Sequence, residues 1–418
     1  MIDTEKNHCM KTLKQYISEQ KNTHMTHIED KVLYGGVNGT RQAILALRSL
    51  RDMLAGAHEG KVSVKWDGAP AIFAGIDPRD GKFFVAKKGI FNKTPKVYKT
   101  PADVDADTSG DLADKLKAAL QYLPALGIKG VVQGDFLFSK ADVQTQKIKG
   151  EQYVTFHPNT IVYAVPANTP SAKEITDAEI GIVWHTTYTG NSFETMKASY
   201  GVDVSKFKKS AKVWSQDAML KDMTNFTMSK EDTNEVNAYL TQAGKLFNQI
   251  SGSTLRELEN NQKLAGMIET FNNTFVRSGT VITDTSKHVD KLVSYISNKY
   301  QKEIDKAKSE KGKASQNAKM QEMLSFFSSS NKANLKKMFD LQKVIVLAKL
   351  KLINILQRLS NTSTFLKTKN GYKTTSQEGY VAIDTLGGDA VKIVDRMEFS
   401  YANFSPDIIK GWDKPTRT

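Results

Sequence analysis

The order of strand-rich and helix-rich stretches constrains the fold of this chain more than any single motif. Residues 61–200 contain short runs of β-branched and aromatic residues between turns, whereas 204–366 show apolar residues at helical spacing. The closing piece, 371–404, regains strand character from residue 379 but has too few strands to fold alone. We therefore expect it to complete the sheet begun at residue 61, with the helical block inserted into one domain.

This order predicts an α+β fold built on an antiparallel sheet. We expect a helical segment at 1–60. A sheet domain is expected in two pieces, at 61–203 and 367–418, and an inserted helical domain at 204–366. Strands are expected in the sheet domain at 62–66, 71–74, 83–86, 131–138, 160–165, 180–184 and 379–404. Helices are expected at 112–123, 235–250, 286–308, 317–327 and 334–359.

Three local signals predict where elements begin or end. Thr40 is a suitable N-cap for a helix that Gly56 would end. The turn residues at 77–81 predict a hairpin connection between two strands. The polar stretch 309–316 contains few apolar residues and is expected to be a mobile turn.

Composition favours a basic cytoplasmic protein with a polyanionic partner. The net charge is +14, which favours nucleic acid over the alternative of a basic protein without such a partner. The single cysteine, Cys9, excludes an intrachain disulfide framework and a thiolate metal cluster. We find neither an apolar run of membrane-spanning length nor a signal peptide, so we expect no membrane partner and a cytoplasmic location, the host cytoplasm if the protein is viral.

A lysine followed by an Asp-Gly turn ends the first expected strand. Lys65 follows β-branched residues and precedes Trp66, Asp67 and Gly68. Burial at a strand end disfavours a charged amine, and a neutral lysine is a usable nucleophile. The alternative is an ordinary β-turn with no chemical role.

Four later segments carry groups that a nucleotide site needs. Lys87 precedes a second lysine and a glycine, a pattern that suits a phosphate contact or a solvated turn. Asp135 interrupts an apolar strand and needs a lysine, a metal or a ribose hydroxyl as partner. Trp184 ends a strand and is either a base-stacking ring or part of the core. Glu378 leads a strand, and Lys392 interrupts another, where it faces either an anion or solvent.

Taken in order, these segments resemble the motifs of the covalent nucleotidyltransferase superfamily, which comprises DNA ligases, RNA ligases and mRNA capping enzymes. Residues 65–68 match the first motif. The next two motifs resemble residues 86–89 and 134–135. The last three resemble residues 183–184, 378–381 and 391–393. The resemblance covers about 61–200 and 371–400. It implies an adenylation domain related to ATP-grasp folds, with the helical domain inserted.

The resemblance also implies an activity and a role for each site residue. Lys65 would attack ATP to form a lysyl-AMP, which then passes to a 5′-phosphate and is displaced by a 3′-hydroxyl. Lys392 would neutralise the α-phosphate, and Glu378 with Asp135 would hold Mg²⁺, or Mn²⁺ in its place. The nucleotide would also meet the remaining motif residues: Trp66 and Gly68 beside the lysine, Asp67 orienting the loop, Lys87 on a phosphate, and Trp184 on adenine.

We favour RNA over DNA as the substrate. Too little chain follows Lys392 for the OB domain of DNA ligases and capping enzymes, and helical accessory domains suit RNA ligases, especially those of bacteriophages. The helical block has lysines that would bind phosphates or simply solvate helix faces: Lys332, Lys336, Lys337, Lys343, Lys349 and Lys351. The alternatives are a DNA ligase without an OB domain and a non-catalytic nucleic-acid-binding protein on a ligase-like scaffold. Pro70, Asp135 and Val394 depart from the family motifs and favour the latter.

Overall fold

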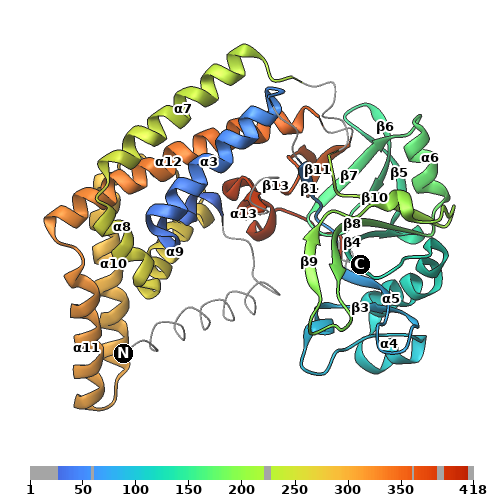
Figure 1. Cartoon of the computed structure of the whole chain (residues 1–418), viewed down its shortest axis with the longest axis horizontal. Helices are drawn as coiled ribbons and strands as arrows, with labels where there is room; N and C mark the ends of the chain where they lie inside the picture. Colours follow the sequence, from blue (N-terminus) through green and yellow to red (C-terminus); the bar gives the residue numbers. More distant parts are fainter. Residues whose placement is uncertain (1–26, 58–60, 221–226, 360–361, 384–389, 413–418) are drawn as a thin grey trace, which may run out of the picture.

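A computed structural model describes residues 27–57, 61–220, 227–359, 362–383 and 390–412. Cys9 and the rest of 1–26 lie outside the described residues. Figure 1 shows a helical lobe on one side, a β-rich lobe on the other, and helix α13 between them. The fold is a mixture of helices and mainly antiparallel sheets, which confirms the expected α+β class. No helix in the described ranges is both long enough and apolar enough to cross a membrane.

The largest sheet of the β-rich lobe has six strands. Its pairing order runs β10-β8-β4-β2-β3, with β9 added beside β8, and only the β10–β8 pair is parallel. The strands are β2 (Ala71–Ile76), β3 (Phe83–Ala86), β4 (Val131–Ser139), β8 (Ile180–Thr189), β9 (Lys197–Tyr200) and β10 (Val213–Asp217). Helix α5 (Gly110–Tyr122) contributes Leu116 to the apolar cluster on one face of this sheet.

The second sheet of this lobe packs on the opposite face of the first. Phe138 and Trp214 from the six-stranded sheet meet Phe156 in their shared core. The order of the second sheet is β12-β11-β7-β6-β5. Its strands are β5 (Gln144–Ile148), β6 (Glu151–Phe156), β7 (Ile161–Pro166), β11 (Ser363–Thr368) and β12 (Gly371–Thr374), and helix α6 (Pro170–Asp177) packs beside it.

A third sheet joins the first expected strand to the closing piece of the chain. Strand β1 (Lys61–Lys65) pairs antiparallel with β13 (Gly379–Ile383), which in turn pairs with β14 (Ala390–Ile393). Lys65 lies opposite Gly379, and Val381 lies opposite Lys392. The closing piece therefore pairs with β1 as expected, but this sheet is separate from the one that contains β2, β3 and β4, so the expectation of a single sheet is wrong.

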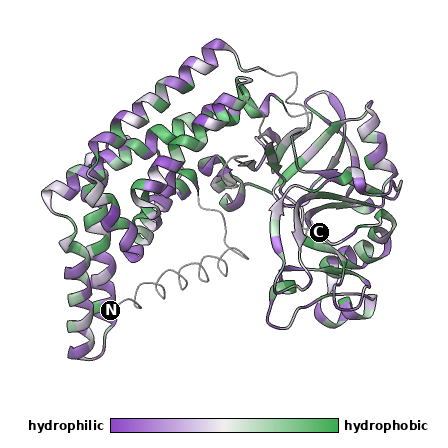
Figure 2. Ribbon diagram, viewed as in Figure 1, coloured by the Kyte–Doolittle hydropathy of each residue, from purple (hydrophilic) through white to green (hydrophobic). Residues whose placement is uncertain are grey.

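The helical lobe has one apolar core that also includes the third sheet. Val64 of β1 and Tyr380 of β13 belong to the same cluster as Leu352 of α12. Figure 2 shows hydrophobic residues along α12 and α3, which contact each other. The lobe contains η1 (Ile28–Asp30), α2 (Lys31–Tyr34), α3 (Gly36–Leu54), α7 (Lys230–Gln249), α8 (Gly252–Asn260), α9 (Gln262–Arg277), α10 (Thr285–Lys306), α11 (Glu310–Ser325) and α12 (Ser329–Gln357).

Three local predictions are wrong. Thr40 does not cap α3 but lies inside it, and its hydroxyl donates to the Gly36 carbonyl at 2.7 Å. Most of 309–316 belongs to α11, because Ser309 caps that helix. Residues 396–404, expected as strand, form helix α13 (Arg396–Phe404), because the Asp395 carboxylate accepts hydrogen bonds from the amides of Met397 and Glu398.

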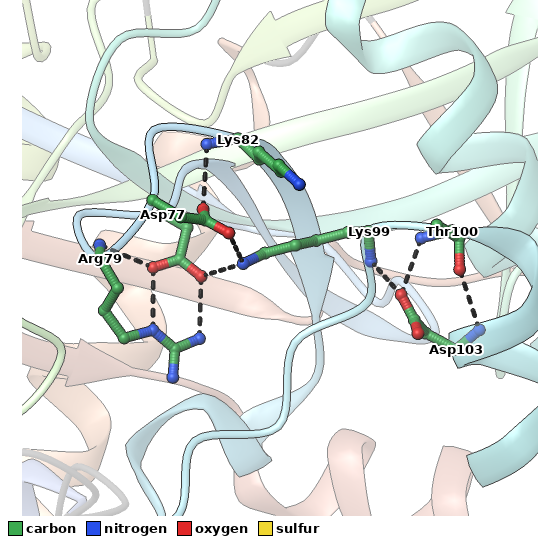
Figure 3. Close-up of polar contacts among 7 residues, drawn as sticks. Asp77, Arg79, Lys82, Lys99, Thr100 and Asp103 are labelled. Carbon is green, nitrogen blue, oxygen red and sulfur yellow. Dashed lines mark hydrogen bonds and ion pairs between the residues drawn. The ribbon is translucent and has the colours of Figure 1, made fainter.

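The expected hairpin between β2 and β3 is present and is held by a buried carboxylate. Asp77 is fully buried, and its oxygens lie 2.8 Å from Arg79 and 2.6 Å from Lys99, as Figure 3 shows. Further along the chain, Thr100 and Asp103 form a capping box at α4 (Pro101–Asp107). These contacts fix the segment that leaves β3, where the lysine pair 87–88 lies.

Candidate active site

Lys65 lies at the end of β1, and its ammonium group forms an ion pair with Glu378. The register of β1 on β13 produces this contact, because Lys65 is opposite Gly379, the residue after Glu378. The Lys65 side chain is 34 % exposed and that of Glu378 is 9 % exposed. The amine is therefore paired with a carboxylate and half-buried, whereas the sequence predicted a buried amine.

Asp135 comes from β4 and lies beside the loop that follows Lys65. A Cβ atom placed on Gly68 would be 2.5 Å from the Asp135 Cβ. The Asp135 carboxylate is 3.8 Å from Nε2 of His185 on β8. His185 lies where the β4–β8 register shifts, since Gln133 pairs with Thr186 and Gly134 with Trp184. Such a bulge changes the direction of a side chain and is frequent beside active sites.

Lys392 approaches from β14, on the far side of β13. Burial lowers the pKa of Lys392, and the charge of Lys65 lowers it further. Its amine lies 5.8 Å from the ring centroid of Phe399 on α13. A partly desolvated ammonium beside another ammonium is costly, so this position favours an anion between or near the two lysines.

The electrostatics show that these groups share one site. Among individual charges, that of Lys65 shifts the pKa most for each of the other four groups, Asp135, Glu378, Lys392 and His185. Burial raises the pKa of Glu378 to about 7, against the attraction of Lys65. Burial also raises the pKa of Asp135 to about 7, again opposed by Lys65. Burial lowers the pKa of His185 to about 4, so its imidazole is neutral at pH 7.

Asp67 holds the loop after Lys65 in place. Its carboxylate accepts hydrogen bonds from Asn159 Nδ2 at 2.6 Å and from the amide nitrogens of Thr160 and Ile161 at 2.7 and 3.0 Å. Its own amide donates to the Tyr163 hydroxyl at 2.6 Å. The expectation that Asp67 orients this loop is confirmed, and these contacts leave it buried.

Trp66 lies between the two lobes. Its ring centroid is 4.7 Å from that of Tyr163 and 6.3 Å from that of Trp214. It also packs against the core of the helical lobe. Trp66 therefore connects the sheet core to the helical core, directly beside Lys65.

Two expected ligand contacts are wrong. Trp184 is fully buried under α5, and its indole nitrogen donates to Ser215 at 2.9 Å, so the ring has no free face for adenine. Lys87 points to α4, where it pairs with Asp107 at 3.2 Å. Its neighbour Lys88 is exposed, and its positive charge lowers the pKa of Asp135.

His185 and Lys88 are thus the site residues to which the motifs assigned no role. The available signal was the alternation of side chains along a strand, since neighbouring residues point to opposite faces. Once Trp184 enters the core, His185 must face the other way. Lys87 and Lys88 lie after β3, where Lys88 begins the 3-10 helix η2 (Lys88–Phe91), so strand alternation does not decide which of them faces the site.

A family model matches residues 22–407, which is nearly the whole chain. The chain belongs to DUF6267, a family of unknown function. No curated protein and no solved structure matches it.

This DUF6267 protein has a set of lysines in the second half of its helical block. Most of them form contacts within the protein. Lys349 is buried and lies 2.8 Å from Glu29. Lys351 binds Asp232 at 2.8 Å, and Lys336 binds Asp340 at 3.0 Å. Of the remaining members, Lys332 pairs with Asp290 at 3.5 Å and Lys337 donates to a backbone carbonyl at 3.1 Å. Lys349 is therefore not available to a phosphate, whereas phosphate binding by the exposed members of this set remains a prediction.

Proposed function

We propose that this protein is an ATP-dependent polynucleotide ligase that joins a 5′-phosphate to a 3′-hydroxyl, with RNA ends preferred. One observation carries the proposal. Lys65, Asp135 and Lys392 come from strands β1, β4 and β14, and Glu378 comes from the turn before β13, yet Lys65 pairs with Glu378 and is the leading charge acting on the other three. An amine surrounded by two carboxylates and a second amine suits nucleotidyl transfer. The description of the β-rich lobe as a nucleotidyltransferase domain belongs to the same proposal.

The first step joins Lys65 to the nucleotide. The Lys65 ammonium first loses one proton to solvent. The neutral Nζ atom then forms a bond to the α-phosphorus of ATP, the bond from that phosphorus to pyrophosphate breaks, and Nζ loses a second proton to solvent. Glu378 positions the amine through their ion pair. Lys392, which lies across β13 from β1, neutralises the charge that develops on the α-phosphate oxygens.

The next two steps transfer the adenylate. An oxygen of the 5′-phosphate displaces Lys65 from the phosphorus, which breaks the P–N bond. The 3′-hydroxyl then attacks the 5′-phosphorus, its proton leaves to solvent, and AMP departs. Lys88, exposed beside Asp135, is placed to contact a phosphate of the nucleic acid.

The two carboxylates suit a divalent cation. Burial raises the pKa of both Glu378 and Asp135 to about 7. The positive charge of Lys65 therefore offsets only part of the free energy that burial adds to the ionisation of these two carboxyl groups. Carboxylate oxygens are the donors that Mg²⁺ and Mn²⁺ accept, and such sites keep several waters. We propose that these two residues hold Mg²⁺, which would neutralise phosphate charge during transfer. The described residues contain no cluster of three or more acidic, histidine or cysteine ligands.

The decisive experiment is labelling of the protein with α-³²P nucleotides and Mg²⁺. We expect an acid-labile protein–AMP adduct with ATP, weak labelling with the other three triphosphates, and no adduct after Lys65→Ala or in excess EDTA. Lys87→Ala is the matched control, since this lysine is tied to Asp107 and should leave labelling unchanged. Failure of the wild-type protein to label with any triphosphate, with Mg²⁺ or Mn²⁺, would overturn the proposal. Joining of 5′-phosphorylated single-stranded RNA is then compared with that of nicked DNA.

A further inference from the structure

Helix α13 presents two aromatic rings to solvent. Tyr401 is 40 % exposed and Phe404 is 68 % exposed. They are three residues apart on one helix, so they occupy neighbouring positions on the same side. Exposing large aromatic rings to water costs free energy, which a partner that covers them would recover.

Each ring has a cation beside it, and the two cations come from different lobes. Lys373 of β12 lies 4.8 Å from the Tyr401 ring centroid, and Arg277 at the end of α9 lies 5.9 Å from that of Phe404. Among the residues that the structure describes, neither cation forms an ion pair with a carboxylate. We call these four residues the α13 patch.

The other side of α13 faces the candidate active site. Phe399 lies against Lys392, and Glu398 and Asp395 line one pocket together with Glu378. A helix with its side chains is about 10 Å wide, so the patch lies within about one helix diameter of the site. In Figure 1, α13 lies between the two lobes, where a ligand on it would contact both.

We propose that the α13 patch binds a single-stranded polynucleotide and holds the strand whose end reaches Lys65. Unpaired bases stack on exposed aromatic rings without regard to sequence, and cations beside the rings neutralise the phosphates between the bases. A docking site for a protein helix would instead need a continuous apolar groove. Here the apolar exposure of α13 consists of two rings flanked by unpaired cations.

This inference rests on the proposed ligase function for the identity of the strand as substrate, but its test does not need catalysis. Fluorescein-labelled 12-nucleotide RNA and DNA of one mixed sequence are titrated with the full chain, and anisotropy gives the Kd. The ring-deleting variant is Tyr401→Leu with Phe404→Leu, which keeps apolar side chains on the helix. The matched control is Tyr401→Phe with Phe404→Tyr, which keeps both rings.

We expect ring deletion to raise the Kd for single strands about tenfold or more, because each stacked base contributes about 1–3 kcal/mol. The ring-keeping variant should bind as the wild type does, and binding of the matching duplex should change little. Arg277→Gln and Lys373→Gln should each reduce the slope of log K against log salt by about 0.7.

Equal single-strand affinity in the ring-deleting and ring-keeping variants overturns the inference, and so does an equal loss of duplex and single-strand binding. Circular dichroism melts confirm that each variant is folded. Nucleotide labelling of Lys65 is measured in parallel. A missing adduct in the wild type would overturn the ligase proposal alone, whereas normal labelling with unaltered strand binding after ring deletion would overturn the patch alone.

Discussion

At the residue scale, Gly68 is required by the close approach of its loop to β4. A Cβ at this position would lie 2.5 Å from the Asp135 Cβ and 3.0 Å from the Phe136 carbonyl oxygen. The loop cannot retreat easily, because Ala69 N–H donates to that same carbonyl at 2.9 Å. We expect Gly68→Ala to destabilise the protein by about 1–3 kcal/mol and to displace Asp135. Urea unfolding measures the first effect, and nucleotide labelling measures the second.

Gly244 provides the control for that substitution. It lies inside α7, and the nearest atom to its added Cβ is 3.7 Å away on the Arg48 side chain. Alanine in a helix interior is more stable than glycine by roughly 0.5–1 kcal/mol. Gly244→Ala should therefore leave stability unchanged or raise it. A similar destabilisation by both substitutions would show that the crowding at Gly68 is not the cause.

The carboxylate of Asp135 makes the stability of the protein depend on pH. Burial raises its pKa from an ordinary 3.8 to about 7. Between these values the folded protein keeps a proton that the unfolded chain has lost, so the free energy of unfolding falls as pH rises from about 4 to about 7. Asp135→Asn removes this contribution, which is about 4 kcal/mol at most.

Urea unfolding in EDTA at pH 5 and pH 8 tests this directly. Relative to the wild type, Asp135→Asn should gain stability on going from pH 5 to pH 8. Asp177→Asn, at an exposed position of α6, should follow the wild type at both pH values. A constant difference between Asp135→Asn and the wild type would contradict the raised pKa.

Sequence reasoning brought Lys65, Asp135, Glu378 and Lys392 together because their segments follow the motif order of a known superfamily. Asp135 and Lys392 also interrupt apolar strands, where a charged residue needs a partner. It failed for Trp184 because composition does not reveal which face of a strand is buried. Lys87 lies beyond the end of β3, and its ion pair with Asp107 depends on where α4 packs. The bulge that aims His185 at the site is a property of how β4 pairs with β8, and that pairing is not encoded locally.

At the scale of elements, one buried ion pair fixes η1 against α12. Both carboxylate oxygens of Glu29 lie 2.8 Å from Lys349 Nζ, and both side chains are buried. Burial opposes ionisation of Glu29, yet Lys349 and Arg396 lower its pKa to about 2. Removing one partner leaves the other buried and under-compensated, so Lys349→Met should destabilise the protein by about 3–5 kcal/mol.

Two further variants identify the cause of that loss. Adding Glu29→Gln to Lys349→Met should recover a large part of the stability, because no carboxylate then remains to be charged. Lys336→Met should change stability by less than about 1 kcal/mol, because its pair with Asp340 is exposed. Thermal melts of the set give the comparison. Additive effects of the two substitutions at Glu29 and Lys349 would contradict the pairing argument.

Helices α11 and α13 show where the sequence misleads at this scale. Met323 is the only buried residue of α11 among those described, and apolar spacing predicted only the second half of this helix, as part of 317–327. The segment of α13 contains Phe399, Tyr401 and Phe404, residue types that favour strands. Asp395 at its N-cap overrides that preference. Helices α3, α5, α7, α10 and α12 were predicted because their apolar residues recur at helical spacing. Helices α8 and α9 were not among the expected helices, and β5, β9 and β12 were missed because most of their residues are exposed.

At the scale of the whole molecule, the third sheet belongs to the helical core and not to the β-rich cores. Val64 and Tyr380 share a cluster with Leu352, whereas Ile182 of β8 belongs to a separate cluster. The site therefore spans two packing units. Lys65, Glu378 and Lys392 are attached to the helical core, and Asp135 with His185 to the β-rich lobe. A movement between these units would change the distance from Lys65 to Asp135.

Paired cavity variants test this division of the molecule. Leu352→Ala should cost about 2–5 kcal/mol and speed amide hydrogen exchange in α12, β1 and β13 while leaving β4 and β8 protected. Ile182→Ala should do the reverse, because its cavity opens under α5. Mass spectrometry of peptides from each strand distinguishes the two patterns. If either variant speeds exchange equally in β1 and β4, the molecule opens as one unit, and the site cannot be divided between two bodies.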